Sequence, residues 1–391
     1  MRALQAFAAV TLIVLVSATS AVVPISFGLP HMSRAVEGAV PRGPVSYRAT
    51  SGLVVSTLVA TIRVGGGPFG VAYDSGNGYV YVANAGTDNV SVISGIAVVA
   101  TIPIIGGGPF GVAYDGDNGY VYVTHRGDNV SVISGTSVAA EVPVGRTPFG
   151  VGYDSSNGYV YVTNRDSDTV SVISNTTVIG TVPVGRSPWG VGYNSGNGYV
   201  YVTNYGSNCP LTCSGSVTVI SGMTVIGTVR VGNGSSGIGY DSVRGYIYVA
   251  NEFSNNVSVI SGTTIVATVP VENNPIGIGY DSTNGYIFVT HAGPYNVSVM
   301  SGTTVLGTVP DGDDPVGAAY NSGNGYVYLT DYGNGTVSVM SFTVVSASPP
   351  ASTFLGLPAV VGYAMLAGIL VLVVVSVVFG LRRLRRKQVI K

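Results

Sequence analysis

One short phrase recurs through most of the chain. It reads Gly-Tyr, then Val or Ile, then Tyr or Phe, and its first tyrosine falls at Tyr79, Tyr120, Tyr159, Tyr199, Tyr246, Tyr286 and Tyr326. Successive copies lie about 40 residues apart, except for one longer interval after Tyr199. A fixed period of this length marks a repeat architecture, in which each copy buries its apolar surface against its neighbours. Seven such units cover residues 53–345.

Each unit contains four segments with strand character, as the third unit shows. Residues 149–153 are short and glycine-rich, residues 159–163 read YVYVT, and residues 170–174 and 177–184 complete the set. The Asn-Gly pair at 157–158 is typical of a hairpin turn. Four strands in each of seven repeats predict an all-β fold, a seven-bladed β-propeller of four-stranded blades.

The alternation within these segments favours a propeller over a two-layer sandwich. In YVYV the side chains point to alternate faces, so an apolar surface lies on both. A blade packed between two neighbours buries both faces, whereas a sandwich strand needs polar residues on one. The first segment of each unit should be innermost, where small glycines let seven strands crowd around the axis. The entering segment 58–64 resembles a fourth strand, so we expect it to complete the last blade and close the ring.

The strand endings at 159–164 and 199–204, both YVYVTN, resemble the motif of the YVTN-family β-propeller repeats. The resemblance extends over the seven units. It implies a propeller fold and a cell-surface location, because that family is common among archaeal and bacterial surface proteins, including surface-layer components. Its relatives include secreted lyase-like and lactonase-like propellers, but a shared fold does not transfer their chemistry.

The two ends of the chain are predicted to be a signal peptide and a membrane anchor. Residues 1–21 read as a signal peptide, with Arg2 before an apolar run and small residues after it. An uncleaved anchor is the alternative. Residues 22–52 are expected to be a linker, and 346–357 a short Ser/Pro linker.

Residues 358–381 carry no charge and are long enough for a transmembrane helix. The tail 382–391 is basic, which predicts that it is cytoplasmic and that the propeller is extracellular on a single-pass cell-membrane protein.

Composition limits the partners. Only 9% of the residues are charged and the formal net charge is −1, which excludes a nucleic-acid binder. Hydrophobic residues make up 46%, so disorder through high charge is excluded as well. Besides the membrane, the expected partners are other surface proteins, glycans or copies of the same chain.

The loop into the innermost strand differs between units. Units 1 to 4 place aromatic residues there and units 5 to 7 do not: the series is Phe69, Phe110, Phe149, Trp189, Ser236, Ile276 and Val316. One interpretation is packing between blades. The other is a binding surface for sugar or peptide at the channel mouth, since exposed aromatic side chains mark such sites.

The residue that ends the YVTN segment also varies, through Asn84, His125, Asn164, Asn204, Asn251, His291 and Asp331. Asparagine suits a turn, where it bonds nearby backbone. His125 and His291 belong to blades that are not neighbours, so a structural role is the favoured interpretation over a shared metal. With Arg146 and Arg186 they remain candidates at the channel mouth.

Charge on the same face is predicted to be segregated. Units 2 to 4 supply Arg126, Arg146, Arg165 and Arg186, and units 5 to 7 supply Glu252, Glu272, Asp311, Asp313, Asp314 and Asp331. The alternatives are ordinary solvated loops and a dipolar face suited to head-to-tail contact between copies. A weak calcium site is predicted at Asp311, Asp313, Asp314 and Asp331, although EF-hand spacing is missing, and no other cofactor is expected.

Two kinds of modification are predicted. Cys209 and Cys213 lie in the insertion of unit 4 and are expected to form a disulfide in an exported protein. Glycosylation sequons occur at Asn89, Asn129, Asn175, Asn233, Asn256, Asn296 and Asn334, most of them generated by the repeat itself.

The sequence therefore predicts a membrane-anchored extracellular propeller that acts as a non-catalytic binding, surface-layer or adhesion module. It shows no spacing that pairs a nucleophile with a base or that gathers metal ligands. The alternative is a propeller enzyme, lyase- or lactonase-like, or a ligand sensor with its site at the channel mouth. A histidine pointing into the channel beside acidic groups would favour this alternative.

Overall fold

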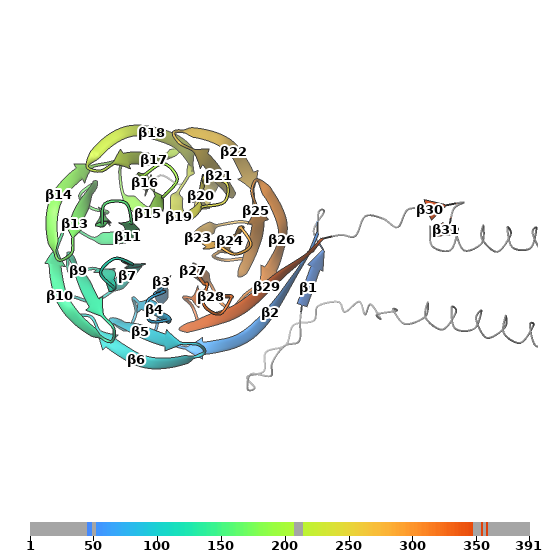
Figure 1. The fold of residues 1–391 in the computed structure, drawn as a ribbon, viewed down its shortest axis with the longest axis horizontal. Coiled ribbons are helices and arrows are strands. Elements are labelled where there is room, and N and C mark those ends of the chain that lie inside the picture. The colour runs from blue at the N-terminus through green and yellow to red at the C-terminus, as the bar shows by residue number, and fades with distance from the viewer. Residues whose placement is uncertain (1–44, 49–51, 207–213, 347–352, 355–356, 359–391) are drawn as a thin grey trace, which may run out of the picture. The chain divides into compact units, whose positions relative to one another are not determined.

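The computed structural model describes residues 45–48, 52–206, 214–346, 353–354 and 357–358. Seven antiparallel sheets stand around a central axis and form a closed ring (Figure 1). Blades 1 to 6 take four consecutive strands each, from β3–β6 to β23–β26. Blade 7 combines β27, β28 and β29 with β2 from the other end of the chain. The predicted all-β, seven-bladed propeller of four-stranded blades is confirmed.

The bounds of the strands repeat from blade to blade. The innermost strands are β3 (Pro68–Tyr73), β7 (Pro109–Tyr114), β11 (Pro148–Asp154), β15 (Pro188–Asn194), β19 (Ser235–Asp241), β23 (Pro275–Asp281) and β27 (Pro315–Asn321). The second strands are β4 (Tyr79–Asn84), β8 (Tyr120–His125), β12 (Tyr159–Asn164), β16 (Tyr199–Asn204), β20 (Tyr246–Asn251), β24 (Tyr286–His291) and β28 (Tyr326–Asp331).

The third strands are β5 (Asn89–Ser94), β9 (Asn129–Ser134), β13 (Thr169–Ser174), β17 (Ser214–Ser221), β21 (Asn256–Ser261), β25 (Asn296–Ser301) and β29 (Thr336–Ser346). The outermost strands are β6 (Ala97–Pro103), β10 (Ser137–Pro143), β14 (Thr177–Pro183), β18 (Thr224–Asn233), β22 (Thr264–Pro270), β26 (Thr304–Pro310) and β2 (Gly52–Arg63). One 3-10 turn, η1 (Glu252–Ser254), follows β20.

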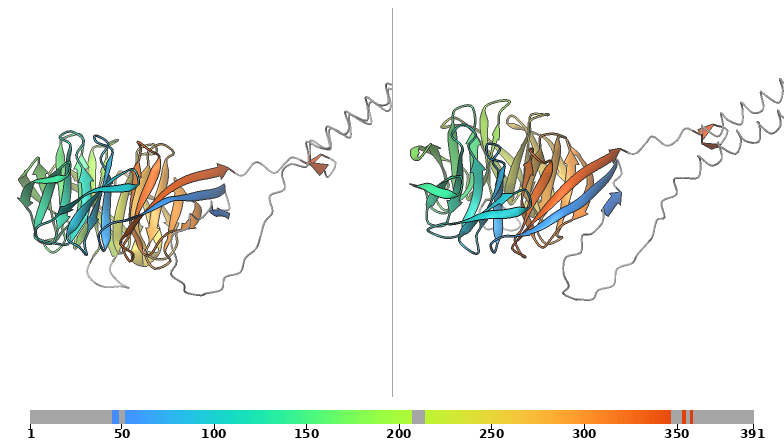
Figure 2. Two further views of the ribbon diagram at one scale, coloured as in Figure 1. Left: turned by 90° about the horizontal axis from the view of Figure 1, so that it is seen from below. Right: turned by 60° about the horizontal axis from the view of Figure 1, so that its bottom comes forward.

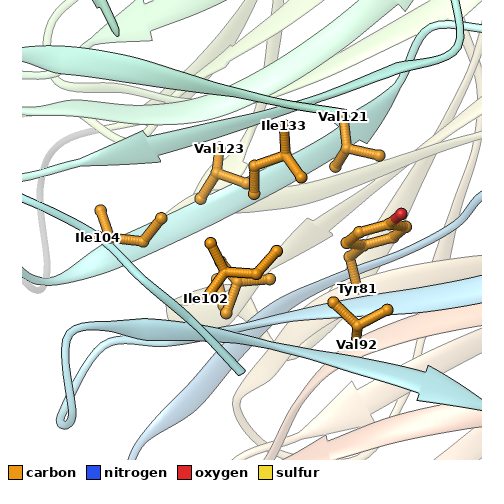
Figure 3. Close-up of a cluster of buried hydrophobic side chains, with 9 residues drawn as sticks. Tyr81, Val92, Ile102, Ile104, Val121, Val123 and Ile133 are labelled. Carbon is orange, nitrogen blue, oxygen red and sulfur yellow. The ribbon is translucent and has the colours of Figure 1, made fainter. Parts of the chain in front are cut away.

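Both faces of the second strand are buried, as the alternating pattern predicts. In β4, Val80, Tyr81 and Val82 are each at most 1% exposed. Tyr81 packs with Val92 and Ile102 of its own blade against Val121 and other side chains of blade 2 (Figure 3). Equivalent clusters fill the other gaps between blades, so the core is a ring of similar interfaces.

In blades 1 to 4 and 7, the central tyrosine of the second strand also joins neighbouring blades. Blade 6 has Phe288 at this position, and Tyr248 of blade 5 bonds Asp241 of its own blade. The Tyr81 hydroxyl donates to the carbonyl of Gly135 at 2.9 Å, and Tyr161 donates to Gly222 at 2.9 Å. Tyr328 of blade 7 donates to Gly95 of blade 1 at 2.7 Å, which links the last blade to the first. A buried hydroxyl needs a partner, and here the partner lies on the turn between the third and fourth strands of the next blade.

Glycine in the innermost strands has a steric cause. A Cβ atom on Gly70, Gly150 or Gly277 would overlap the carbonyl oxygen of Phe110, Trp189 or Val316 in the adjacent blade. Only a residue without a side chain allows seven strands to approach the axis this closely. This agrees with the crowding expected from the sequence.

The ring is closed by strand pairing between the two ends of the repeat region, as the sequence predicts. β2 pairs antiparallel with β29 from Arg63 opposite Thr336 to Gly52 opposite Ser346. The two strands continue together beyond the ring (Figures 1 and 2). Val54 and Phe342 of this extension pack against Phe288 in blade 6, with the Phe288 and Phe342 rings 4.6 Å apart.

Three short strands lie in or at the edge of the predicted linkers. β1 (Val45–Arg48) pairs with β2 inside the predicted linker 22–52. β30 (Thr353–Phe354) pairs with β31 (Leu357–Pro358) in the Ser/Pro segment. Among the described residues no helix is apolar and long enough to cross a membrane. The predicted signal peptide lies outside the described residues, as does the predicted transmembrane segment apart from Pro358.

Candidate functional site

Two sets of loops meet on one side of the ring, which we call the aromatic face. One set leads from each outermost strand to the next innermost strand, and the other connects the second strand to the third. Backbone hydrogen bonds tie the two sets together: Arg165 N–H donates to Thr147 O at 3.0 Å, and Tyr205 N–H donates to Ser187 O at 3.0 Å. These bonds place the residue after each second strand beside the start of the innermost strand.

The four aromatic residues predicted at the channel mouth lie in contact. Phe110 stacks on Phe149 with ring centroids 4.7 Å apart, and Phe149 lies 4.1 Å from Trp189. Phe69 meets Phe110 and Phe149 edge-on at 5.7 and 5.3 Å. Such edge-to-face and offset contacts stabilise aromatic clusters beyond the area they bury.

The cluster extends beyond the four residues that the sequence analysis named. Tyr205 stacks on Trp189 at 5.0 Å, and Phe253 of η1 meets Tyr205 at 5.6 Å. At the other end, Tyr332 meets Phe69 at 6.5 Å. We call these seven rings the aromatic cluster. Phe253 and Tyr332 are 43% and 44% exposed, so the cluster presents ring surface to solvent.

The rings also meet across one end of the central channel. Phe69 of blade 1 lies 6.4 Å from Trp189 of blade 4, although three blade steps separate them. Below the rings, a cavity of ≈ 170 Å³ is lined by the innermost strands, including Val71, Val151 and Ile238. This is smaller than the roughly 300–1,000 Å³ of pockets that enclose small molecules. A ligand of that size therefore has room on the face rather than inside the channel.

Threonine of the YVTN segment holds the backbone beneath the cluster. Thr163 Oγ1 donates to the carbonyl of Trp189 at 2.9 Å and accepts from Gly150 N–H at 2.7 Å. Thr124 holds the Phe149 carbonyl at 2.6 Å in the same way. Each threonine thus fixes the aromatic residue of the next blade. Sequence reasoning missed this role, although the recurrence of threonine at this position was the available signal.

Arginine side chains lie over the cluster. The Arg165 guanidinium carbon is 4.8 Å from the Trp189 ring centroid, 5.8 Å from Phe149 and 5.9 Å from Tyr205. Arg126 lies over Phe110 at 5.3 Å. A cation over an aromatic face is attracted by the ring quadrupole. Of the two predicted arginines, Arg146 bonds the Asp166 carbonyl at 3.0 Å, and Arg186 is exposed.

The Glu252 carboxylate lies at the blade 5 end of the aromatic cluster. The Tyr205 hydroxyl donates to Glu252 Oε2 at 2.8 Å. Burial raises the pKa of Glu252 above its usual range, partly offset by this hydrogen bond and by Arg165. Burial and the bond to Glu252 raise the pKa of Tyr205. The hydroxyl therefore stays protonated and donates.

The two histidines lie inside their blades. His125 is fully buried, and its Nε2 lies 3.1 Å from Glu141 Oε2 on the outermost strand. His291 bonds Ser298 on the third strand through Nε2 and the Asn273 carbonyl through Nδ1. Burial lowers the pKa of His291 to about 4. His125 bonds the outermost strand and His291 bonds the third strand, and neither histidine is among the residues that line the channel cavity.

The asparagines at the same position bond the third strand in the same way. Asn164 Nδ2 donates to Ser171 Oγ at 2.9 Å, and Asn251 Nδ2 donates to Ser258 Oγ at 2.9 Å. The predicted backbone turn cap is thus replaced by side-chain bonds between strands.

Charge is less segregated than the sequence analysis predicts. The arginine-bearing loops also carry Asp128, Asp166 and Asp168, which that interpretation left out. On the other side, Asp331 is fully buried and Glu252 is bonded to Tyr205. The loops therefore do not present a simple dipolar face. The predicted contact between copies stays a prediction.

Two carboxyl groups are buried together in blade 7. Asp331 Oδ2 accepts from Ser338 at 2.9 Å and Thr336 at 3.0 Å, while its Oδ1 has no partner among the described residues. Burial and the carboxylate of Asp311 raise the pKa of Asp331 to about 8, and burial raises the pKa of Asp311 to about 6. Asp311 follows β26 where Val144 follows β10 and Val184 follows β14.

The predicted calcium ligands do not form a complete set. Asp313 and Asp314 are half-buried in the loop before β27. Over the described ranges, no group of three or more His, Cys, Asp or Glu side chains is arranged to hold a metal ion. The geometry gives the calcium prediction no support.

The modification sites divide by exposure. Asn175 and Asn334 are exposed, whereas Asn89, Asn129, Asn233, Asn256 and Asn296 are half-buried. Asn89 and Asn256 also have bonded side chains, accepting from Asn84 and Asn251 at 2.8 Å. Asn175 and Asn334 are therefore the sequons best placed for glycosylation. Cys209 and Cys213 lie outside the described residues.

Comparison with known proteins supports the fold alone. No family model matches the sequence, and a search of curated proteins finds no match. The YVTN-family assignment stays a prediction. Solved structures do match. The chain shares the fold of known propeller proteins.

A hydrazine synthase of Kuenenia stuttgartiensis matches with a TM-score of 0.61 and 17% identity, over 72% of this chain and 96% of that one. A streptogramin B lyase matches with a TM-score of 0.64 and 14% identity, over 74% of this chain and 98% of that one. An inactive virginiamycin B lyase from Staphylococcus aureus with quinupristin matches with a TM-score of 0.61 and 14% identity, over 76% of this chain and 99% of that one. At these identities, chemistry does not carry over.

Proposed function

We propose that the protein is a non-catalytic binding module of the cell surface whose ligand, a glycan, lies on the aromatic face. The observation that carries the proposal is the aromatic cluster itself. Seven rings from six blades form one connected set, and its ends at Phe253 and Tyr332 expose ring surface. Exposed aromatic surface on an otherwise polar face marks a binding site. The proposed export signal and C-terminal anchor would present this face outside the cell.

The form of the face favours a glycan over a peptide. Extended peptides bind by adding a strand to a free sheet edge, and helical peptides need an apolar groove. The aromatic face is built of loops, while the free edges of the blades lie on the outer strands. The rings also meet across the channel mouth, and the cavity that they share with the innermost strands is only ≈ 170 Å³. Flat rings among short polar loops suit the faces and hydroxyl groups of sugar rings.

The single tryptophan of the chain provides the test. Trp189 is the only one, and it lies within the cluster, so its fluorescence reports on this face. The full-length protein in detergent is titrated with defined oligosaccharides and, separately, with unstructured peptides. We expect saturable changes with oligosaccharides and none with peptides. Chemical analysis of the same mixtures should recover the sugars unchanged.

Variants at the exposed rings connect the signal to the site. Phe253→Ala and Tyr332→Ala should each weaken oligosaccharide binding by roughly two- to tenfold, from the lost stacking. Ile96→Ala is the matched control, because Ile96 is 58% exposed on a turn at the opposite face. Binding of peptides alone, or equal binding by all three variants, would refute the proposal. Conversion of the sugar would instead support the enzyme alternative.

A further inference from the structure

Among the described residues, Arg165 on the aromatic face forms no ion pair, although Glu252 lies close enough for the two charges to interact. Arg165 is half-buried, with its guanidinium stacked near the rings of Trp189, Phe149 and Tyr205. Within residues 52–206 and 214–346, the ion pairs are His125 with Glu141 and Arg244 with Asp241. In those ranges no side-chain hydrogen bond is made by the Arg165 guanidinium. With respect to these residues, its N–H groups are available at the edge of the ring stack.

The carboxylates on the same loops are used differently. Asp168 Oδ1 accepts from Ser187 N–H at 2.8 Å, and Asp128 Oδ1 accepts from Thr147 N–H at 2.8 Å. Asp166 Oδ2 accepts from Thr147 Oγ1 at 2.6 Å. These acids hold the loops in place. The arginines are left with donors to offer, although acids and arginines are both present.

From this arrangement we infer that the ligand is an acidic glycan, and that Arg165 binds its carboxylate. The inference rests on the proposed function and adds the chemical class. A guanidinium offers five donors in a planar fork that matches a carboxylate with two parallel bonds. Stacking on rings restrains the guanidinium and leaves its edge open, so little side-chain entropy is lost when the anion binds. Arg126, over Phe110, places a second guanidinium beside the next ring.

The same stack explains why the sugar and the charge are recognised together. The exposed rings of the cluster contact the apolar face of a sugar, and the guanidinium contacts the acidic group that the sugar carries. Glu252 lies at the blade 5 end of the cluster and is engaged by the Tyr205 hydroxyl. A negative charge on the ligand is thus favoured toward Arg165 and Arg126 and disfavoured near Glu252. The ligand would consequently bind in one orientation.

The test compares two forms of one sugar chain. Oligogalacturonate carries a carboxylate on every unit, and its methyl ester has the same backbone without charge. With Trp189 fluorescence as the readout, we expect the acid to bind roughly ten- to a hundredfold more tightly than the ester, the range of one charge-assisted bonding pair. Added salt should weaken binding of the acid and leave that of the ester unchanged.

Variants assign the effect to Arg165. Arg165→Gln should remove the preference for the acid while binding of the ester stays within about twofold. Arg165→Lys keeps the charge but loses the planar fork, so it should restore only part of the preference. Arg230→Gln is the matched control, because Arg230 is exposed on outer strand β18 and its replacement makes the same change in net charge. Melting temperatures show whether each variant is folded.

The outcomes separate this inference from the proposed function. Equal binding of acid and ester by the wild type would overturn the acidic class and leave the glycan module standing. A preference for the acid that survives Arg165→Gln would overturn the role of Arg165. Failure of any oligosaccharide to bind would overturn the proposed function itself, and this inference with it.

Discussion

Blades 1 to 4 and blades 5 to 7 have the same four-stranded framework but begin their innermost strands differently. In the first group, Phe69, Phe110, Phe149 and Trp189 meet over the axis. In the second group the same position holds Ser236, Ile276 and Val316, and Ser236 bonds the carbonyl of Ile276 at 3.1 Å. At this position the channel mouth is thus lined by four rings on one side and by a small polar contact and aliphatic side chains on the other.

The difference shows which positions of the repeat are fixed by the fold and which are free to vary. The glycine of the innermost strand lies against the next blade in every unit, so the ring requires it. The central aromatic residue of the second strand is tyrosine in six units and phenylalanine in blade 6, so the fold requires a buried ring there. The second residue of each innermost strand lies at the channel mouth, and its side chain is aromatic, polar or aliphatic in different blades. Variation collects there and at the ends of the second strands, and that is where the proposed site lies.

Truncation to alanine at this position of the innermost strand should have the largest effect on stability. The loss should be larger in blades 1 to 4, where a ring is removed, than in blades 5 to 7. Phe149 is 5% exposed among three other rings, so Phe149→Ala should cost roughly 3–5 kcal/mol of unfolding free energy. Val316 holds the same position in blade 7 at 6% exposure, and Val316→Ala should cost about half as much, since fewer carbons are removed. Denaturant midpoints measure both. Equal losses would mean that the rings do not stabilise one another.

The buried acids of blade 7 should make stability depend on pH in a way that blades 1 to 4 do not. The pKa of Asp331 is raised to about 8, above the value of about 3.9 in an unfolded chain. The folded protein therefore holds an extra proton between these values, and stability should fall as the pH rises through this range. Asp331→Asn, which installs the side chain of Asn164, should flatten that dependence and raise the melting temperature at pH 8 by about a few degrees.

The reverse exchange sharpens this comparison. Asn164→Asp puts a buried acid into blade 3, where Val144 stands in place of Asp311. Burial alone should raise the pKa of the new carboxyl, so this variant should acquire the alkaline sensitivity that Asp331→Asn loses. Melting temperatures across the pH range compare the two. A wild-type curve that is flat between pH 4 and 8, or one that responds to added calcium, would contradict the protonated pair.

Loss of the threonine hydrogen bonds beneath the aromatic cluster should have the next largest effect on stability. Thr163→Val leaves the Gly150 N–H and the Trp189 carbonyl without this partner, at a cost of about 1–3 kcal/mol. Thr330→Val removes the same pair of bonds in blade 7, to Gly317 and Phe69, and should cost a similar amount. Denaturation measures both losses. Thr163→Val should shift the emission of Trp189 more than Thr330→Val, because Thr163 bonds the Trp189 carbonyl itself and Thr330 bonds that of Phe69. An equal shift in both variants would show that the bond does not position the ring locally.

The architecture could be predicted from the sequence because it depends on contacts that repeat. YVYV alternation, glycine at the innermost strand and a fourth-type strand before the first unit together predicted the blades and the closure at β2 and β29. β1 was not predicted, because a four-residue strand outside the repeat has no second copy to reveal it.

The site was predicted only in part, for a related reason. The four aromatic residues share one repeat position and were found, whereas Tyr205, Phe253 and Tyr332 come from loops of unequal sequence. That the rings meet across the axis depends on three-dimensional closure. The placement of His125 and the pairing of Asp311 with Asp331 likewise depend on contacts between strands that no single period encodes.

The smallest expected effect tests the blade 5 end of the cluster. Tyr205→Phe keeps a ring at 5.0 Å from Trp189 but removes the hydroxyl that donates to Glu252. The lost bond should cost about 0.5–1.5 kcal/mol of unfolding free energy.

Because that bond lowers the pKa of Glu252 against the effect of burial, its loss should raise this pKa further. Trp189 emission should then titrate at higher pH in the variant than in the wild type, since stacking still couples the cluster to Glu252. An unchanged titration would show that the carboxylate acts independently of the rings, and a loss as large as that of Phe149→Ala would show that Tyr205 supports the cluster through its hydroxyl rather than its ring.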